Sequence, residues 1–157
     1  MALVAQPLTH ARDGQVQGCG VRVTGGEAGR AASSWFDVSV NVFGAGGSLV
    51  QTIVYELKPS EDGEARPARV PVRSTWISAG AGSTRRGENI ARRDTLVYSL
   101  LLEDALALFE ALADGRSIAV GIRRWGEPEE TVHKGAPVLD EAARAEVAAC
   151  LGSLKFD

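Results

Sequence analysis

The sequence has few of the residues on which catalytic and metal sites depend. Its 157 residues include only two histidines and two cysteines, and aromatic residues make up 6%. No stretch approaches the roughly 18 consecutive apolar residues of a membrane-spanning helix. The net charge is −3, whereas a nucleic-acid-binding domain is usually strongly basic. These absences argue against a membrane span and against a nucleic-acid partner.

Patterns for metal or nucleophilic chemistry are also missing. His10 and His133 each stand without a second ligand at the spacing of a zinc site. No G-x-S-x-G motif marks a serine nucleophile. Cys150 falls on the apolar face of an expected helix, where a reactive thiolate is disfavoured. We therefore expect no catalytic residue, no metal and no cofactor, and a protein that is not an enzyme.

The two cysteines lie at opposite ends of the region that looks folded. Cys19 begins it and Cys150 stands in its last helical pattern. A bond between them would close a loop of about 130 residues, worth roughly 4–5 kcal/mol in the chain-entropy model. We predict this disulfide, which is typical of an oxidising compartment. The alternative is two buried thiols that never meet, since free cysteine packs as a small apolar residue.

The N-terminal residues do not determine the cellular compartment of the protein. Residues 1–10 lack the basic region and apolar run of a signal peptide. Either the protein is cytoplasmic, or a signal peptide has been removed and Met1 stands in its place. The predicted disulfide favours a periplasmic or secreted protein.

Alternation of apolar and polar residues predicts about seven short strands. They cover residues 19–23, 36–42, 49–58, 68–77, 95–101, 117–124 and 130–134. In the third strand, Leu49 and Leu57 share one phase. In the fourth, Trp76 shares a face with Val72, while Pro71 points the other way, as in an edge strand.

The period then changes to that of helices. One apolar stripe predicts a helix over residues 103–113, formed by Leu102, Ala105, Leu106, Phe109, Leu112 and Ala113. Leu108 lies off this stripe. Asp140, a good N-cap residue, opens a second helix that runs to Leu154. We predict a flexible arm over residues 1–17, then a single antiparallel, β-rich α+β domain over residues 18–157 with two helices in its C-terminal half.

The C-terminal third has a recognisable order of elements. A helix at Ala105–Leu112 is followed by Gly115, a strand at Ser117–Val120, a second strand, and a terminal helix containing Ala148-Ala149-Cys150. Over about fifty residues this order resembles small exported bacterial proteins of the invasion-associated locus B type and related periplasmic domains. The resemblance implies an exported, β-rich, non-enzymatic accessory or interaction domain, and it implies no binding residues.

Glycines, hydroxyls and arginines are concentrated in residues 80–94. Backbone amides beside guanidinium groups can cradle a phosphate, sulfate or carboxylate. The candidate binding residues are Arg85, Arg86, Arg92, Arg93 and, at the entry of the loop, Trp76. The segment is not a P-loop, because no Lys-Ser/Thr pair follows its last glycine. The alternatives are a surface loop of solvated or paired arginines and a tryptophan that covers the core.

Three classes of function remain. The first, which we favour, is an exported, non-enzymatic domain that binds a protein partner. The second is a small-molecule-binding domain that holds an anionic ligand on the loop at residues 80–94. The third is an enzyme with an unfamiliar site. A water-filled pocket lined by Arg85 or Arg86 would favour the second.

Overall fold

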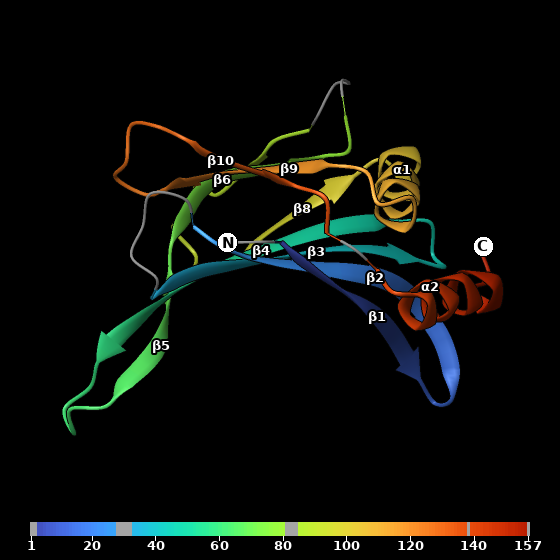
Figure 1. Cartoon of the computed structure of the whole chain (residues 1–157), viewed down its shortest axis with the longest axis horizontal. Helices are drawn as coiled ribbons and strands as arrows, with labels where there is room; N and C mark the ends of the chain where they lie inside the picture. Colours follow the sequence, from blue (N-terminus) through green and yellow to red (C-terminus); the bar gives the residue numbers. More distant parts are fainter. Residues whose placement is uncertain (1–2, 28–32, 81–84, 138, 157) are drawn as a thin grey trace.

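The structure is a computed structural model that describes residues 3–27, 33–80, 85–137 and 139–156. They form two antiparallel sheets that face each other, with two helices at one end (Figure 1). The predicted α+β class is confirmed, and both helices lie in the second half of the chain. The number of strands is ten rather than about seven.

The two sheets divide the strands unequally. Sheet A has the order β1-β2-β3-β4-β5, and β8 pairs with the first half of β4. Its strands are β1 (Val4–Arg12), β2 (Gln15–Gly26), β3 (Ser34–Phe43), β4 (Ser48–Pro59), β5 (Ala65–Val70) and β8 (Leu96–Leu100). Sheet B has the order β10-β9-β6-β7. Its strands are β6 (Val72–Ser78), β7 (Gly87–Glu88), β9 (Ile118–Arg124) and β10 (Thr131–Gly135).

The N-terminal residues correct one prediction. Residues 1–17, expected to be a flexible arm, contain β1 and the start of β2. The two strands are joined by Asp13 and Gly14, both at positive φ (52° and 76°). An Asp-Gly pair with two positive φ values is a common two-residue hairpin turn. The alternation along β1 is weak because an edge strand buries little, so Asp13-Gly14 was the signal that could have identified this hairpin.

Pro71 divides the predicted strand 68–77 between the two sheets. β5 ends at Val70 in sheet A, and β6 begins at Val72 in sheet B. Because proline has no N–H to contribute to a ladder, the chain can change sheets here without losing a donor. A register shift between Val72 and Ser74 follows. Because of this shift, the Trp76 side chain lies on the outer face of sheet B. The alternation in the sequence had placed it on the same face as Val72, which is the inner face.

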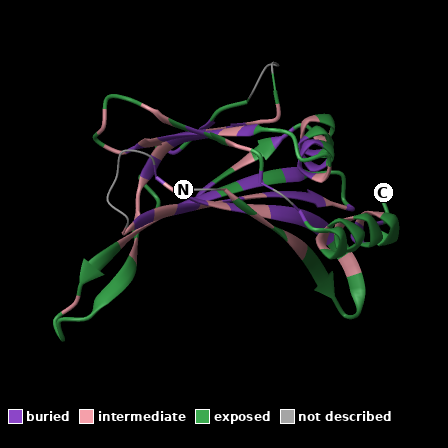
Figure 2. Cartoon of the chain, in the orientation of Figure 1, coloured by how far each residue is buried: buried purple, intermediate pink, exposed green. Residues whose placement is uncertain are grey.

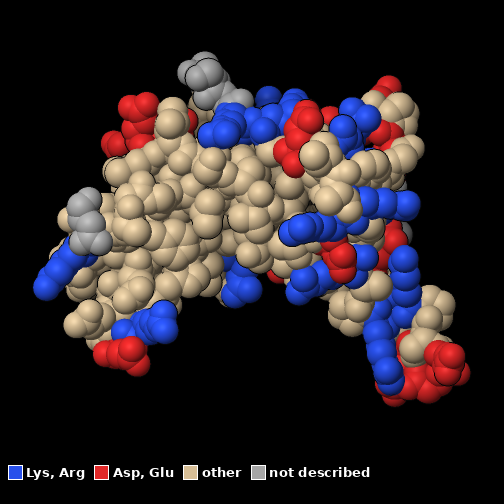
Figure 3. Space-filling model, turned by 180° about the vertical axis from the view of Figure 1, so that it is seen from behind, with Lys and Arg blue, Asp and Glu red and all other residues tan. Residues whose placement is uncertain are grey.

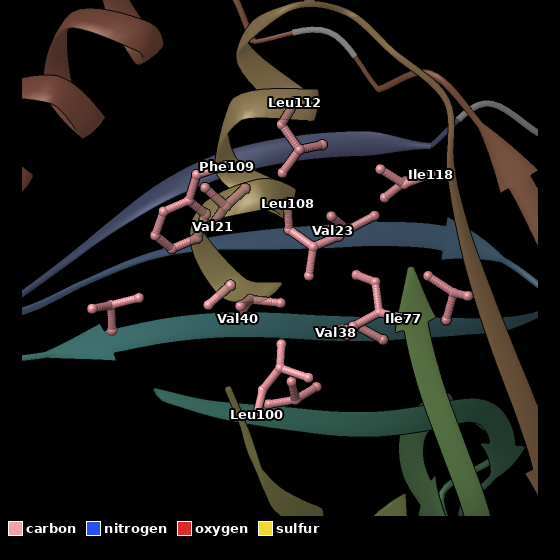
Figure 4. Packing of buried hydrophobic residues seen from close by; sticks show 14 of the residues in the cluster. Val21, Val23, Val38, Val40, Ile77, Leu100, Leu108, Phe109, Leu112 and Ile118 are labelled. Carbon is pink, nitrogen blue, oxygen red and sulfur yellow. The ribbon is translucent and has the colours of Figure 1, made fainter. Parts of the chain in front are cut away.

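The core lies between the sheets and is rich in valine. Figure 4 shows Val21, Val23, Val38 and Val40 of sheet A facing Ile77 and Ile118 of sheet B. The inward phase of β4 is that of Val50, Thr52 and Val54. Leu49 and Leu57, which share the other phase, are 38% and 41% exposed. Choosing the inward face of β4 by its largest apolar side chains therefore gives the wrong face.

Helix α1 (Leu102–Ala113) covers one end of the core. Its buried residues are Ala105, Leu108, Phe109, Ala111 and Leu112. Leu108 is 2% exposed and Leu106 is 39% exposed, so the predicted stripe is wrong at these two positions. The helix lies against β3 and β9, and this wider contact buries Leu108 beside Phe109 (Figure 4).

Helix α2 (Glu141–Ser153) lies on β1 and β2. The side chain of Asp140 accepts a hydrogen bond from the backbone N–H of Ala143 at 2.7 Å, which confirms the predicted N-cap. Only Cys150 is buried within the helix, and most of its surface is exposed (Figure 2). The predicted disulfide is present: Cys19 of β2 and Cys150 are bonded, with their Cα atoms 5.9 Å apart.

Candidate functional site

The outer face of sheet A is concave. The β1–β2 and β4–β5 hairpins bend away from sheet B on either side of it (Figure 1). The space-filling view shows the hollow between these two projections, with charged side chains of both signs at the β4–β5 tip (Figure 3). No other described element covers this face, which we call the concave face.

Two glycines of β2 shape the surface of the concave face. A Cβ atom on Gly20 would lie 2.2 Å from Asn41 Oδ1, and one on Gly18 would lie 2.6 Å from the Phe43 ring. Asn41 and Phe43 therefore lean from β3 across β2. On the far side they meet His10 of β1, whose Nε2 donates to Asn41 Oδ1 at 2.6 Å. The rings of His10 and Phe43 lie 5.5 Å apart.

Further hydrogen bonds hold the polar side chains of this face. Asn41 Nδ2 donates to Ser39 Oγ at 3.2 Å, and Thr24 Oγ1 donates to Asp37 Oδ1 at 2.6 Å. Together with the His10–Asn41 bond, these contacts order the side chains before any partner arrives. Pre-ordered side chains reduce the entropy lost on binding.

A depression of about 210 Å³ opens on the concave face. Its lining combines apolar Leu8 and Ile53 with Arg22, Asp37 and Tyr55. The ring of Tyr55 stacks on that of Trp35, with centroids 5.3 Å apart. The mixture of an apolar floor, aromatic rings and oriented polar groups is typical of protein-binding surfaces.

The concave face carries charges of both signs. Arg22 and Asp37 line the depression, and Arg69 is the cross-strand partner of Tyr55 and so shares its face.

The loop residues predicted from sequence are only partly brought together. Trp76 lies over Gly121, where a Cβ atom would be 2.1 Å from the indole nitrogen. That nitrogen donates to Glu130 Oε1 at 2.8 Å, and Arg86 forms an ion pair with the same oxygen. Trp76 and Arg86 therefore share Glu130 as a partner, and the charge of Arg86 is paired with this carboxylate. Arg85 is exposed.

The far end of the loop is held by hydrogen bonds of the Asn89 side chain. The Asn89 side chain donates to the backbone oxygens of Val72 and Arg93, at 2.9 and 2.6 Å, and accepts from the N–H of Arg93. The side chains of Arg92 and Arg93 are exposed. The Gly-rich part of the loop, residues 81–84, lies outside the described residues.

The sequence missed a buried ionic cluster that joins the two sheets. Arg124 of β9 forms ion pairs with Glu27, at 2.7 Å, and with Glu56 of β4. Its Nη2 also donates to Ser34 Oγ at 2.7 Å. Burial lowers the pKa of Arg124, but the hydrogen bonds and charges of Glu56 and Glu27 outweigh burial and raise it. Every polar group of Arg124 named here has a partner within the protein, so we assign the cluster to structure.

Trp125 follows Arg124 in the chain, but the cation over its ring comes from β6. The guanidinium carbon of Arg73 lies 5.0 Å from the Trp125 ring centroid. The pair is a structural cation–π contact.

The described residues contain no group of three or more His, Cys, Asp or Glu side chains that could hold a metal ion. Among the helices described, none is long and apolar enough to cross a membrane. The disulfide is consistent with an oxidising compartment.

Comparisons with protein-family models, with curated proteins and with solved structures find no match to this chain.

Proposed function

We propose that this protein is an exported, non-enzymatic domain that binds a protein partner on the concave face of sheet A. The observation that carries the proposal is the ordered row of His10, Asn41 and Ser39 across the glycines of β2. Ordinary solvent-facing sheet surfaces do not require such close approaches. Here Gly18 and Gly20 leave the space into which the neighbouring side chains fold.

The chemistry of the face favours a protein over a small ligand. The depression, at about 210 Å³, is smaller than the roughly 300–1,000 Å³ of small-molecule sites. The aromatic pair Trp35–Tyr55 and the arginines Arg22 and Arg69 are residue types enriched at the centres of protein interfaces. We infer a partner that presents acidic side chains.

Export is supported by the disulfide and by the resemblance of the C-terminal third to exported bacterial domains. The alternative function, an anionic ligand on residues 80–94, receives less support because Arg86 is already paired with Glu130. Arg85, Arg92 and Arg93 are exposed.

Site-specific photo-crosslinking in the producing cells tests the proposal. A benzophenone side chain at Gln51 on the concave face should give a discrete protein adduct, and one at Ala145 on exposed α2 should not. Arg22→Glu should remove the adduct, whereas Arg116→Glu, just after α1, should leave it. Equal adducts at both positions, or none at Gln51, would overturn the assignment of this face.

A further inference from the structure

A larger cavity lies where three segments that are distant in the chain meet. It has a volume of about 520 Å³ and is bounded by the β1–β2 hairpin, the β3–β4 turn and the end of α2. Figure 1 shows α2 beside this hairpin. The volume falls within the roughly 300–1,000 Å³ of small-molecule sites. We call it the α2 cavity, and no described residue lines both it and the depression of the concave face.

Three contacts fix the walls of the α2 cavity. The disulfide between Cys19 and Cys150 ties α2 to β2. The backbone N–H of Gly44, in the β3–β4 turn, donates to the backbone oxygen of Gln17 at 3.0 Å. A Cβ atom on Gly44 would lie 2.3 Å from the backbone oxygen of Lys155, so the chain after α2 packs directly on the turn. The cavity is therefore formed before any ligand arrives.

A β-bulge in β2 contributes to the lining. His10 and Ala11 of β1 are the partners of Gly18 and Val16 of β2, so Gln17 is an extra residue in the pairing. A bulge changes the direction of a side chain relative to the regular strand, and bulges are over-represented next to active sites. In this protein the bulged residue, Gln17, lines the α2 cavity.

The polar groups of the α2 cavity match an acidic ligand that is rich in hydroxyl groups. Its polar side chains among the described residues are those of Gln15, Gln17, Ser153 and Lys155. Carboxamide and hydroxyl groups both donate and accept hydrogen bonds, as the hydroxyls of a sugar do. Lys155 carries the one charge among the described lining residues, and an ammonium group attracts a carboxylate.

We propose that the α2 cavity binds a sugar acid, that is, a small polyhydroxy carboxylate. The carboxylate pairs with the ammonium group of Lys155, and the hydroxyls exchange hydrogen bonds with Gln15 and Gln17. Lys155 is exposed, and exposed ion pairs are weak, so we expect a dissociation constant of about 1 mM. The inference does not rest on the proposed function, because the cavity and the depression of the concave face share no described residue.

An NMR titration of the purified, oxidised protein tests the proposal. Gluconate, added up to about 20 mM, roughly twenty times the expected dissociation constant, should shift the amide signals of residues 15–17, 44–45 and 153–155. Sorbitol has the same carbon chain with a hydroxyl in place of the carboxylate. It should bind about threefold more weakly, which is the size of one lost exposed ion pair. Sodium chloride keeps the ionic strength equal in the two titrations.

A charge-removing variant locates the carboxylate. Lys155→Gln should bind gluconate about threefold more weakly and should no longer prefer gluconate to sorbitol. Because Lys155 is exposed, this variant should fold normally. Lys134→Gln, at an exposed lysine of β10, is the matched control and should bind both compounds as the wild-type protein does. Equal binding of gluconate and sorbitol by the wild-type protein, no shifts around the cavity, or unchanged affinity in Lys155→Gln overturns the proposal.

Discussion

The two ends of the sandwich are closed by different physical means. At one end, α1 buries five side chains between the sheets, and the disulfide fastens α2 to β2. At the other end, Arg124 joins β9 to Glu27 and Glu56 of the opposite layer. The helical end depends on apolar area and a covalent bond, and the ionic end depends on ion pairs between a buried guanidinium and two carboxylates. This difference decides how each end responds to mutation, reduction and pH.

The largest expected effect is at the helical end, on removing the disulfide. Cys19 and Cys150 are separated by 131 residues, and cross-linking so long a loop stabilises the fold by about 4–5 kcal/mol in the chain-entropy model. The double variant Cys19→Ala/Cys150→Ala should lose about this much unfolding free energy in a urea titration. Because α2 buries only Cys150, its amides should lose hydrogen-exchange protection before those of α1.

Reductant supplies the control for this prediction. It should destabilise the wild-type protein to the level of the double variant and have no effect on that variant. Uptake of two alkyl groups by unreduced, denatured wild-type protein would show that the bond does not form.

The next effect is at the ionic end. Arg124→Met removes the guanidinium that compensates two carboxylates, and breaking a buried pair in this way costs about 3–5 kcal/mol. The side chains of Arg124 and Glu27 are 7% and 4% exposed. The measurement is again the unfolding free energy from urea titration.

Arg66→Met is the matched control, since the side chains of Arg66 and its ion-pair partner Asp62 are 63% and 50% exposed. Such solvent-exposed pairs contribute little to stability. Similar losses in the two variants would mean that the ionic end does not hold the sheets together.

The third prediction concerns the buried face of α1. Leu108→Ala should cost about 2–5 kcal/mol, the usual range for emptying a core leucine site. Leu106→Ala should cost much less, because Leu106 is 39% exposed and Leu108 is 2% exposed. A larger loss at Leu106 in denaturant titrations would restore the stripe predicted from sequence, and equal losses would contradict the packing of α1 against β3 and β9.

These positions also show what could be predicted from sequence and what could not. Periodicity identified both helices, and alternation identified the inward faces of β3 and β9, because those residues face one continuous core. It failed at Leu108 and along β4, where both phases contain apolar residues. In such cases the neighbouring layer decides which phase is buried, and one strand or helix does not contain that information.

The site and the ionic end depended still more on distant partners. Arg124 and Glu27 are 97 residues apart in the chain, and nothing near either residue marks the pair. Likewise, the role of Gly18 and Gly20 appears only once Phe43 and Asn41 lie across them. The disulfide was the exception, because with two cysteines in the chain only one intramolecular pairing exists.

The smallest expected effect is a pH dependence that originates near the ionic end. His133 is buried, with its ring 4.7 Å from that of Phe36. Burial lowers the pKa of His133 below its ordinary 6.5, and the charge of Glu27 acts in the opposite direction. The unfolded chain therefore binds a proton near pH 6.5, while the folded protein binds it only at lower pH. The resulting stability is present above pH 6.5 and is lost as the pH falls through the folded pKa of His133.

Urea titrations from about pH 7.5 to about pH 5.5, above the range of ordinary carboxylates, should show this decline in the free energy of unfolding. In His133→Gln the decline should be weaker, and an unchanged slope would place its origin elsewhere in the fold.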